Sequence, residues 1–222
     1  MKQIAVVGMS SFGLHLAERL TDLGCEVLAV DRDEALVNEI KSRVASAAVA
    51  DITDPHVIRD LHLSEMDAVV LSLGSQFETC MLAALRLLEA NARQIVVKAI
   101  KEEHVKIFEI IGVHRVVFPE RDMAWRAAAT LLNANVTDYL PLSAEYSIVE
   151  IEPAPEMLAK TLKELDFRSR YGCQVIAIKS NQGERKARLA HPESVIHPDD
   201  TLVVIGRDKD LGGMKERTPK SS

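Results

Sequence analysis

The sequence of 222 residues predicts a doubly wound parallel α/β sheet followed by a small α+β domain. Two observations predict the sheet: short apolar runs alternate with helical segments as far as about residue 118, and a glycine-rich turn follows the first run directly. A third observation predicts the second domain, because the alternation stops after Pro119. We expect a first domain over residues 1–135, a second over 136–214 and a disordered polar tail over 215–222.

The strands of the first domain are expected at six continuous apolar runs. Such runs are typical of parallel strands that are covered on both faces, and right-handed crossovers then give a doubly wound sheet. The runs are Ile4–Val7, Val27–Val30, Ala47–Ala50, Ala68–Leu71, Ile95–Val97 and Val116–Phe118.

Apolar residues at helical spacing separate these runs. Two segments show this best: Phe12, Leu16, Leu20 and Leu23 in the first, and Phe77, Met81, Ala84, Leu85 and Leu88 in the fourth.

A helix is expected next over residues 121–133, with an apolar stripe of small residues from Met123 to Leu132. The stripe either closes the core of its own domain or packs against a second copy of the chain. Trp125, the only tryptophan, lies off the stripe and is a candidate contact with something else.

The second domain is expected to begin after a polar, turn-prone stretch over residues 133–143. Its predicted elements are strands at Tyr146–Ile151, Cys173–Ile178 and Leu202–Ile205, a helix at Leu158–Leu165, and turns at Asn181–Gly183, His191–Pro192 and His197–Asp199. A domain of this size is near the lower limit for an independent core, so self-association is a plausible support.

Composition excludes several classes of function. A net charge of -6 argues against a nucleic-acid binder, which needs a basic surface. The three cysteines form no C-x-x-C pair, so we expect packing residues in a reducing cytoplasm. No segment resembles a secretory signal or a membrane span, so we expect a soluble protein that reaches a membrane only through another protein.

The strongest local motif is the turn from Gly8 to Gly13, which matches G-x-S-x-x-G between the first strand and the first helix. It is a Rossmann dinucleotide fingerprint with serine in place of the second glycine. Gly8 would make the tight turn, Ser10 would let the backbone approach phosphates, and Gly13 would let helix and strand pack closely. Phosphate would then lie at the helix N-terminus.

Asp31 ends the second strand, at the distance where an acid binds the ribose of a nucleotide. The alternative role is an N-cap of the next helix, which Asp33 could also serve. A carboxylate here disfavours the 2′-phosphate of NADP despite the adjacent Arg32. It does not separate NAD from ADP or ATP.

Further candidates lie at the carboxyl ends of the other strands, where open α/β sheets bind ligands. Each is either a ligand contact or a loop residue. The expected nucleotide site therefore comprises Gly8, Ser10, Ser11, Phe12, Gly13, Asp31, Arg32, Asp51, Ile52, Ser72, Gly74 and Lys98. We expect no catalytic residue.

Motifs in both domains, in order, resemble the cytoplasmic regulatory subunits of Ktr/Trk bacterial potassium uptake systems. They are IAVVGMSSFG, CEVLAVDRD, VVKA, IGVHRVVFPERDMA, EYSIVE and RYGCQVIAIK. The resemblance covers nearly the whole chain. It implies an RCK-type Rossmann domain, a small C-terminal RCK domain, and homodimers that assemble into a ring, an octamer, on a membrane pore protein.

The same resemblance implies roles for particular residues. The phosphate turn and ribose acid match Gly8, Ser10, Gly13 and Asp31, and Glu120 matches an acid near the phosphates that binds Mg²⁺ or Ca²⁺. Glu120 could instead only stabilise the N-terminus of the following helix. The family often has glycine at position 10 and arginine at position 11. The resemblance implies that this arginine contacts phosphates. Because this chain has Ser11 there, the resemblance does not imply discrimination between ATP and ADP.

The region around Arg168, Ile176 and Ile178 resembles the place where some relatives hold cyclic di-AMP between two subunits. A strand buried in a dimer interface is the alternative.

For the chain as a whole, the leading hypothesis is a nucleotide-sensing gating subunit. The rivals are an NAD-dependent dehydrogenase, which needs an acid/base group in a substrate domain, and a redox-sensing transcription factor, which needs a basic DNA-binding helix.

Overall fold

A computed structural model describes residues 1–132, 135–180 and 186–215 of the chain. The chain divides into two compact units, residues 1–120 and 121–222. The turn expected at Asn181–Gly183 and residues 216–222 of the expected tail lie outside the described residues.

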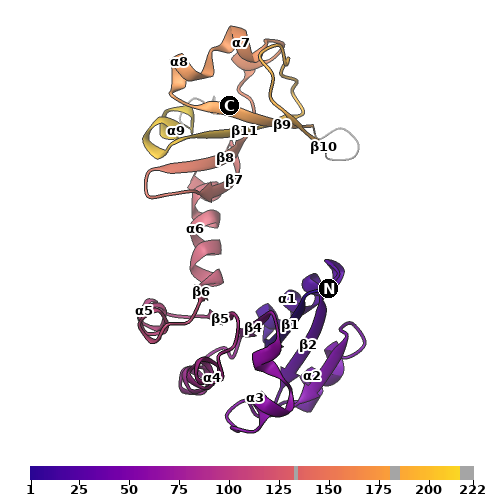
Figure 1. The fold of residues 1–222 in the computed structure, drawn as a ribbon. Helices are drawn as coiled ribbons and strands as arrows, with labels where there is room; N and C mark the ends of the chain where they lie inside the picture. The colour runs from indigo at the N-terminus through magenta and orange to yellow at the C-terminus, as the bar shows by residue number, and fades with distance from the viewer. Residues whose placement is uncertain (133–134, 181–185, 216–222) are drawn as a thin grey trace. The chain divides into compact units, whose positions relative to one another are not determined.

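The first unit contains a parallel sheet with strand order β3-β2-β1-β4-β5-β6 (Figure 1). Its strands are β1 Gln3–Val7, β2 Glu26–Asp31, β3 Ser46–Val49, β4 Ala68–Leu71, β5 Ile95–Lys98 and β6 Arg115–Val117. All six predicted strands are confirmed to within one or two residues at their ends. The order reverses between β1 and β4, and this reversal creates the crevice where doubly wound sheets bind ligands.

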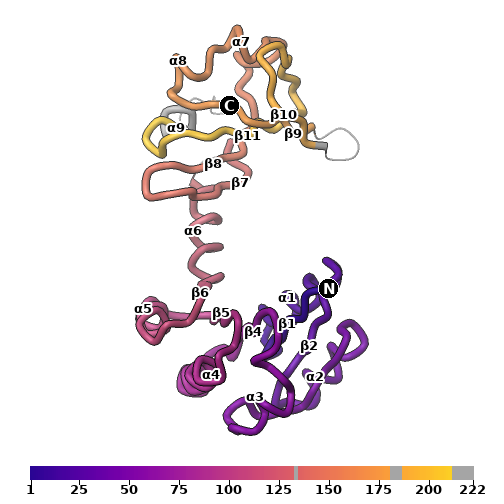
Figure 2. The backbone as a smooth tube through the Cα atoms, in the orientation of Figure 1, coloured from indigo at the N-terminus to yellow at the C-terminus, as the bar shows by residue number. Residues whose placement is uncertain are grey.

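Helices cover both faces of this sheet, as the backbone trace shows (Figure 2). Alternate residues of β1 point to opposite sides, so Ile4 and Val6 pack in one core and Ala5 and Val7 in the other. The first core includes residues of α1 and α2, and the second includes residues of α3, α4 and α5. The helices are α1 Ser11–Asp22, α2 Glu34–Ile40, α3 Val57–Asp60, a short 3-10 turn η1 Leu63–Glu65, α4 Phe77–Glu89 and α5 Glu102–Ile111.

Two residues of the predicted apolar faces do not pack as expected. Leu23 lies just beyond the end of α1 and is 64% exposed, and Leu85 on α4 is 38% exposed. The helix ends one residue before Leu23, so the 3.6-residue period no longer directs that side chain into the core.

The second unit contains an antiparallel sheet with strand order β10-β9-β11-β8-β7. Its strands are β7 Val136–Pro141, β8 Tyr146–Ile151, β9 Gln174–Ser180, β10 Lys186–Leu189 and β11 Asp200–Arg207. Its shorter elements are the 3-10 turn η2 Pro155–Met157 and the helices α7 Leu162–Leu165, α8 Phe167–Tyr171 and α9 Asp208–Lys215. One apolar core holds them together, with Ile178, Ile196 and Leu202 completely buried.

Two predictions for this unit are wrong. Residues 136–141, expected in a turn-prone stretch, form the edge strand β7, which tolerates Asp138 and Pro141 because one side of it forms no ladder. The expected helix Leu158–Leu165 is reduced to α7, because Ala159 takes a left-handed backbone conformation (φ 57°) and Thr161 caps a new helix.

Helix α6, Pro119–Leu132, confirms the helix expected over residues 121–133, but it buries none of its residues. Leu131 and Leu132 are 85% and 83% exposed, and Met123 is 56% exposed. The stripe therefore closes no core within the unit that contains most of α6. Arg126 holds α6 to β7 through three hydrogen bonds to Asp138, of 2.7, 2.8 and 3.3 Å.

Within the described residues, no helix combines the length and the apolar character that crossing a membrane requires.

Candidate ligand site at the carboxyl edge of the parallel sheet

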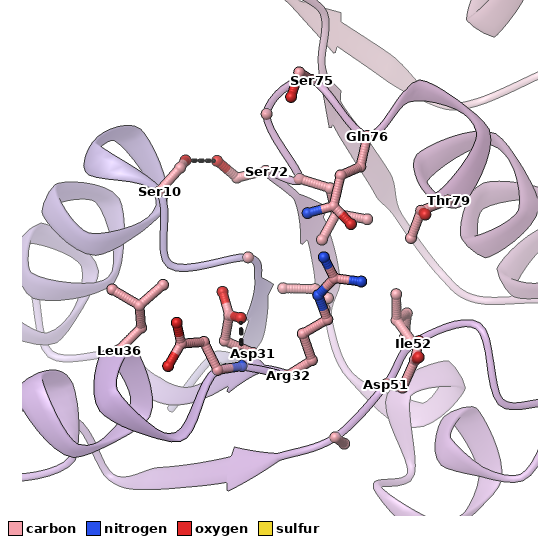
Figure 3. Close-up of a pocket in the computed structure, with 16 residues that line it drawn as sticks. Ser10, Asp31, Arg32, Leu36, Asp51, Ile52, Ser72, Ser75, Gln76 and Thr79 are labelled. Atoms are coloured by element: carbon pink, nitrogen blue, oxygen red, sulfur yellow. Dashed lines mark hydrogen bonds between the residues drawn. The ribbon is translucent and has the colours of Figure 1, made fainter.

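A cavity of about 340 Å³ opens where β1, β2, β3 and β4 end (Figure 3). It brings together eight of the predicted site residues: Gly8, Ser10, Asp31, Arg32, Asp51, Ile52, Ser72 and Gly74. These residues lie as far apart as positions 8 and 74, and the parallel sheet places them on one edge.

The two glycines of the fingerprint are required by close contacts. Gly8 has φ +94°, and a Cβ atom on it would lie 2.5 Å from the carbonyl oxygen of Ser72. A Cβ atom on Gly13 would lie 2.0 Å from the carbonyl oxygen of Gly8. Gly13 faces the β1–α1 turn rather than the cavity, so its role is to let α1 start close behind β1.

The N-terminus of α1 is open to an anion. Ser10 occupies the N-cap position, but its side chain makes no capping bond, and the first turn contains no acidic residue. The Ser10 hydroxyl instead lies 2.7 Å from the Ser72 hydroxyl (Figure 3). The first backbone N–H groups of a helix have no partner within the helix, so they and the helix dipole favour a phosphate at this end.

Asp31 is held rigidly by backbone groups on both sides of it. Its Oδ2 accepts a hydrogen bond of 2.6 Å from the Met9 N–H, and its Oδ1 accepts one of 2.9 Å from the Asp33 N–H. A carboxylate has about four acceptor positions, so two remain for the hydroxyl groups of a ribose. Asp33 caps α2 by accepting from the Ala35 N–H at 2.8 Å, and the alternative role of Asp31 as that cap is therefore wrong.

Asp51 presents an ionised carboxylate on the other side of the cavity. Its Oδ1 accepts hydrogen bonds from the Thr53 hydroxyl at 2.7 Å and the Thr53 N–H at 2.9 Å. These bonds lower the pKa of Asp51, burial opposes them, and the positive charge of Arg32 adds a lesser lowering effect. Arg32 extends into the cavity toward Gln76 (Figure 3).

Several residues that line the cavity were not predicted from the sequence. Gln76 follows Gly74 in the loop after β4. The same expectation that ligands bind at the carboxyl ends of the strands, which predicted Ser72, could have been extended to it. Leu36 and Thr79 come from the faces of α2 and α4, and no local pattern distinguishes them from packing residues. The unselected lining residues are Val7, Asp33, Leu36, Ala50, Leu73, Ser75, Gln76 and Thr79.

Five predicted residues do not line this cavity: Ser11, Phe12, Gly13, Lys98 and Glu120. Three of them form a separate cluster. The Lys98 ammonium lies 2.5 Å from the Glu120 carboxylate and 5.6 Å from the centre of the Phe12 ring. The Lys98 side chain is only 8% exposed, whereas that of Glu120 is 56% exposed.

The charge of Glu120 is stabilised by this pairing. Partial burial raises the pKa of Glu120, but the hydrogen bond from Lys98, the backbone N–H of Glu120 and the charge of Lys98 together lower it. Across the described part of the chain, no three His, Cys, Asp or Glu side chains gather as a metal site would require. A cation at Glu120 would thus have to draw its other ligands from elsewhere.

The second unit has its own cavity, also of about 340 Å³, beside α7, α8 and the start of β9. Arg168 and Lys163 line it together with Phe167 and Pro192. Of the other residues selected by resemblance, Ile178 is completely buried in the core, and neither Ile176 nor Ile178 lines the cavity.

Both units match known protein families. The TrkA-N domain matches residues 4–119, and the TrkA-C domain matches residues 146–217. The chain is 38% identical over 216 residues to Ktr system potassium uptake protein C of Bacillus subtilis, covering 97% of each chain. It is 36% identical over 210 residues to Ktr system potassium uptake protein A of the same organism, covering 95% of this chain and 94% of that protein.

Solved structures support the fold. The RCK domain of GsuK has a TM-score of 0.70 at 16% identity and covers 100% of this chain and 48% of that one. The TrkA-N domain of the inner membrane protein ybaL from Escherichia coli has a TM-score of 0.52 at 20% identity, covering 59% of this chain and 96% of that one.

Proposed function

This chain belongs to the family built from TrkA-N and TrkA-C domains, which includes the Ktr system potassium uptake proteins, and from that premise we propose that it is a nucleotide-sensing regulatory subunit of a potassium uptake system. The observation that carries the proposal is the cavity at the edge of the parallel sheet, where Asp31 and the glycine turn face the same space. Nucleotide in this cavity would control a membrane pore protein.

The ligand would be an adenine nucleotide, ATP or ADP, with NAD or NADH as the alternative. Its phosphates would lie at the N-terminus of α1 beside Ser10 and Ser72, and its ribose hydroxyls would donate to Asp31. The distribution of charge supports this orientation. The first turn of α1 contains no acidic residue, and the helix N-terminus supplies partial positive charge for the phosphates.

The base would bind between Arg32, Ile52 and Asp51. Asp51 has a lowered pKa and therefore accepts hydrogen bonds at neutral pH. The exocyclic amino group of adenine can donate to it, whereas the corresponding carbonyl oxygen of guanine would be repelled. This difference favours adenine over guanine.

The same cavity supports a binding role more than a catalytic one. None of its described lining residues is a His, Lys, Tyr or Cys, and its acids are held by backbone groups or have a lowered pKa. A hydride-transfer enzyme needs a group that exchanges a proton near neutral pH. We therefore propose that the chain is not an enzyme.

The partner would be a pore-forming membrane subunit of the Ktr/Trk type, and the chain would lie at the inner face of the plasma membrane in the cytoplasm. The exposed stripe of α6 would pack against a second copy, and dimers would assemble into a ring, an octamer. The cavity of the second unit would bind cyclic di-AMP, with Arg168 contacting a phosphate.

Calorimetric titration with ATP, ADP, NAD and NADH, with and without Mg²⁺, tests the binding proposal. Potassium flux into vesicles that contain a Ktr-type pore subunit tests regulation, with the purified chain added on the inner side. We expect flux to change with the nucleotide added, and the Asp31→Ala variant to lose that response. Steady hydride transfer from NADH to oxo-acids, or flux that ignores nucleotide, would refute the proposal.

A further inference from the structure

A third cavity, of about 550 Å³, lies in the first unit between the α3–η1 segment and the carboxyl end of α4. It shares no lining residue with the nucleotide cavity. Its wall carries three basic side chains, Arg59, His62 and Arg86. Neither the fingerprint nor the family resemblance selected any of these residues.

Arg86 is the unusual member of this group. It is half-buried on α4, and its Nη1 atom is buried without a hydrogen-bond acceptor. The two acids of the cavity, Glu65 and Glu89, form no ion pair with it, although Glu89 follows it by three residues on the same helix. A buried donor without a partner is costly, and native structures usually provide an acceptor for it.

Arg59 adds a second positive charge at the exposed rim of the cavity. Its Nη2 lies 3.0 Å from Nδ1 of His56, and its Nε lies 3.3 Å from the Asp60 carboxylate. These neighbours hold the guanidinium in place while its side chain remains 74% exposed. Arg59 and Arg86 therefore line the same cavity, and Arg59 is the more exposed of the two.

We propose that this cavity binds a small anionic metabolite through a carboxylate or phosphate group held by Arg86 and Arg59. The planar guanidinium fork matches the geometry of both groups and can donate two parallel hydrogen bonds to either. The ligand would accept hydrogen bonds from the accessible N–H groups of Arg86 and Arg59. The cavity has room for a ligand larger than a single phosphate. Glu65 and Glu89 also line it and would repel additional negative groups on such a ligand.

Calorimetry on the full chain, with inorganic phosphate in one titration and acetate in the other, tests the proposal. We expect at least one of them to bind, and Arg86→Met to weaken that binding by about tenfold or more, because a charge-assisted pair is lost. Arg86→Lys should bind at an intermediate strength, since it keeps the charge but not the fork. Arg19→Met, which removes an exposed arginine of α1, is the matched control and should bind like the wild type.

The two titrations distinguish the sources of the anion: binding of phosphate alone assigns a phosphate ligand, and binding of acetate alone assigns a carboxylate ligand. Thermal unfolding provides a second readout. Without ligand, Arg86→Met should be at least as stable as the wild type, because it removes a buried donor that has no partner, and it should lose the stabilisation by the bound anion.

If Arg86→Met does not fold, Arg59→Gln replaces it and should weaken binding without affecting the fold. Absence of binding to the wild type at millimolar concentrations of both probes overturns the proposal. Equal binding by the wild type and the arginine variant tested also overturns it, because the anion then lies elsewhere.

Discussion

At the scale of single residues, two aspartates at and just after the end of β2 have different roles because they lie at different places in the fold. Asp33 uses its carboxylate to cap α2, and Asp31 receives backbone N–H groups from Met9 and Asp33. The first role is local in sequence. The second depends on the parallel pairing of β1 with β2, which brings position 9 beside position 31.

Replacing Asp31 with Ala should weaken binding of adenine nucleotide by about tenfold or more, because the ribose hydroxyls lose their acceptor. Calorimetry measures this directly. The contrasting variant Asp33→Ala should lower the free energy of unfolding by about 1 kcal/mol, as loss of an N-cap does, with a much smaller effect on affinity. Unchanged affinity in Asp31→Ala would remove the ribose assignment.

The Lys98–Glu120 pair leads to a second prediction at this scale. A phosphate near the N-terminus of α1 would compete with Glu120 for Lys98, and a divalent cation could bridge Glu120 and phosphate oxygens. We therefore expect Mg²⁺ or Ca²⁺ to tighten nucleotide binding to the wild type. Glu120→Gln should lose most of that dependence and keep its metal-free affinity.

Titrations with and without a chelator measure the effect of the metal, and Glu103→Gln, an acid at the start of α5, is the control. If Glu120 serves only as a partner of Lys98 and of the α6 N-terminus, its replacement will lower thermal stability slightly. The metal dependence will then equal that of the wild type, and Glu120 will have no place in the site.

At the scale of elements, helix α6 is unusual because its apolar residues are exposed while a polar contact anchors it. Arg126 and Asp138 form the hydrogen-bonded ion pair that joins it to β7. The hydrogen bond from Arg126 lowers the pKa of Asp138, assisted by the Tyr139 N–H and by the charges of Arg126 and Lys179, and burial opposes this effect. The anchor thus depends on an ionised carboxylate.

This dependence predicts how stability changes with pH. The pKa of Asp138 is lower in the folded chain than its ordinary value of 3.8, so the pair stabilises the fold fully above that value. Its contribution should disappear as the pH falls from about 4 through the lower folded pKa. Urea unfolding of wild type and Asp138→Asn should therefore differ at pH 7 and converge in acid, and a difference that persists in acid would contradict this role.

At the scale of the whole molecule, each unit has its own core, and the second core is small. The apolar face of α6 has no partner among the described residues of its own unit, and exposed leucines of this kind are typical of an interface between subunits. A symmetric dimer would cover the same face on both copies.

We therefore expect light scattering to show at least a dimer at micromolar concentration. Leu132→Asp should shift the protein toward monomer, because it places a charge in the interface, while circular dichroism should stay unchanged since the side chain is 83% exposed. Leu23→Asp, at an exposed position beyond the end of α1, is the control. A wild type that is monomeric would exclude this interface.

The sequence by itself determined the parallel sheet, its strands and the glycine turn. Strands that are covered on both faces must be apolar along their length, and a phosphate turn requires Gly8 and Gly13, so both features can be found from neighbouring positions alone. It also placed eight of the cavity residues, because the carboxyl ends of parallel strands meet at one edge.

Only the tertiary structure decided which side chains pair across the fold. Ser10 meets Ser72 from 62 positions away, and Lys98 meets Glu120 rather than the main cavity. An edge strand such as β7 tolerates polar residues and proline, so its sequence does not show the apolar pattern by which strands are usually recognised. The sequence likewise does not predict that Nη1 of Arg86 is buried without a hydrogen-bond partner. That property depends on how α4 packs against the α3–η1 segment.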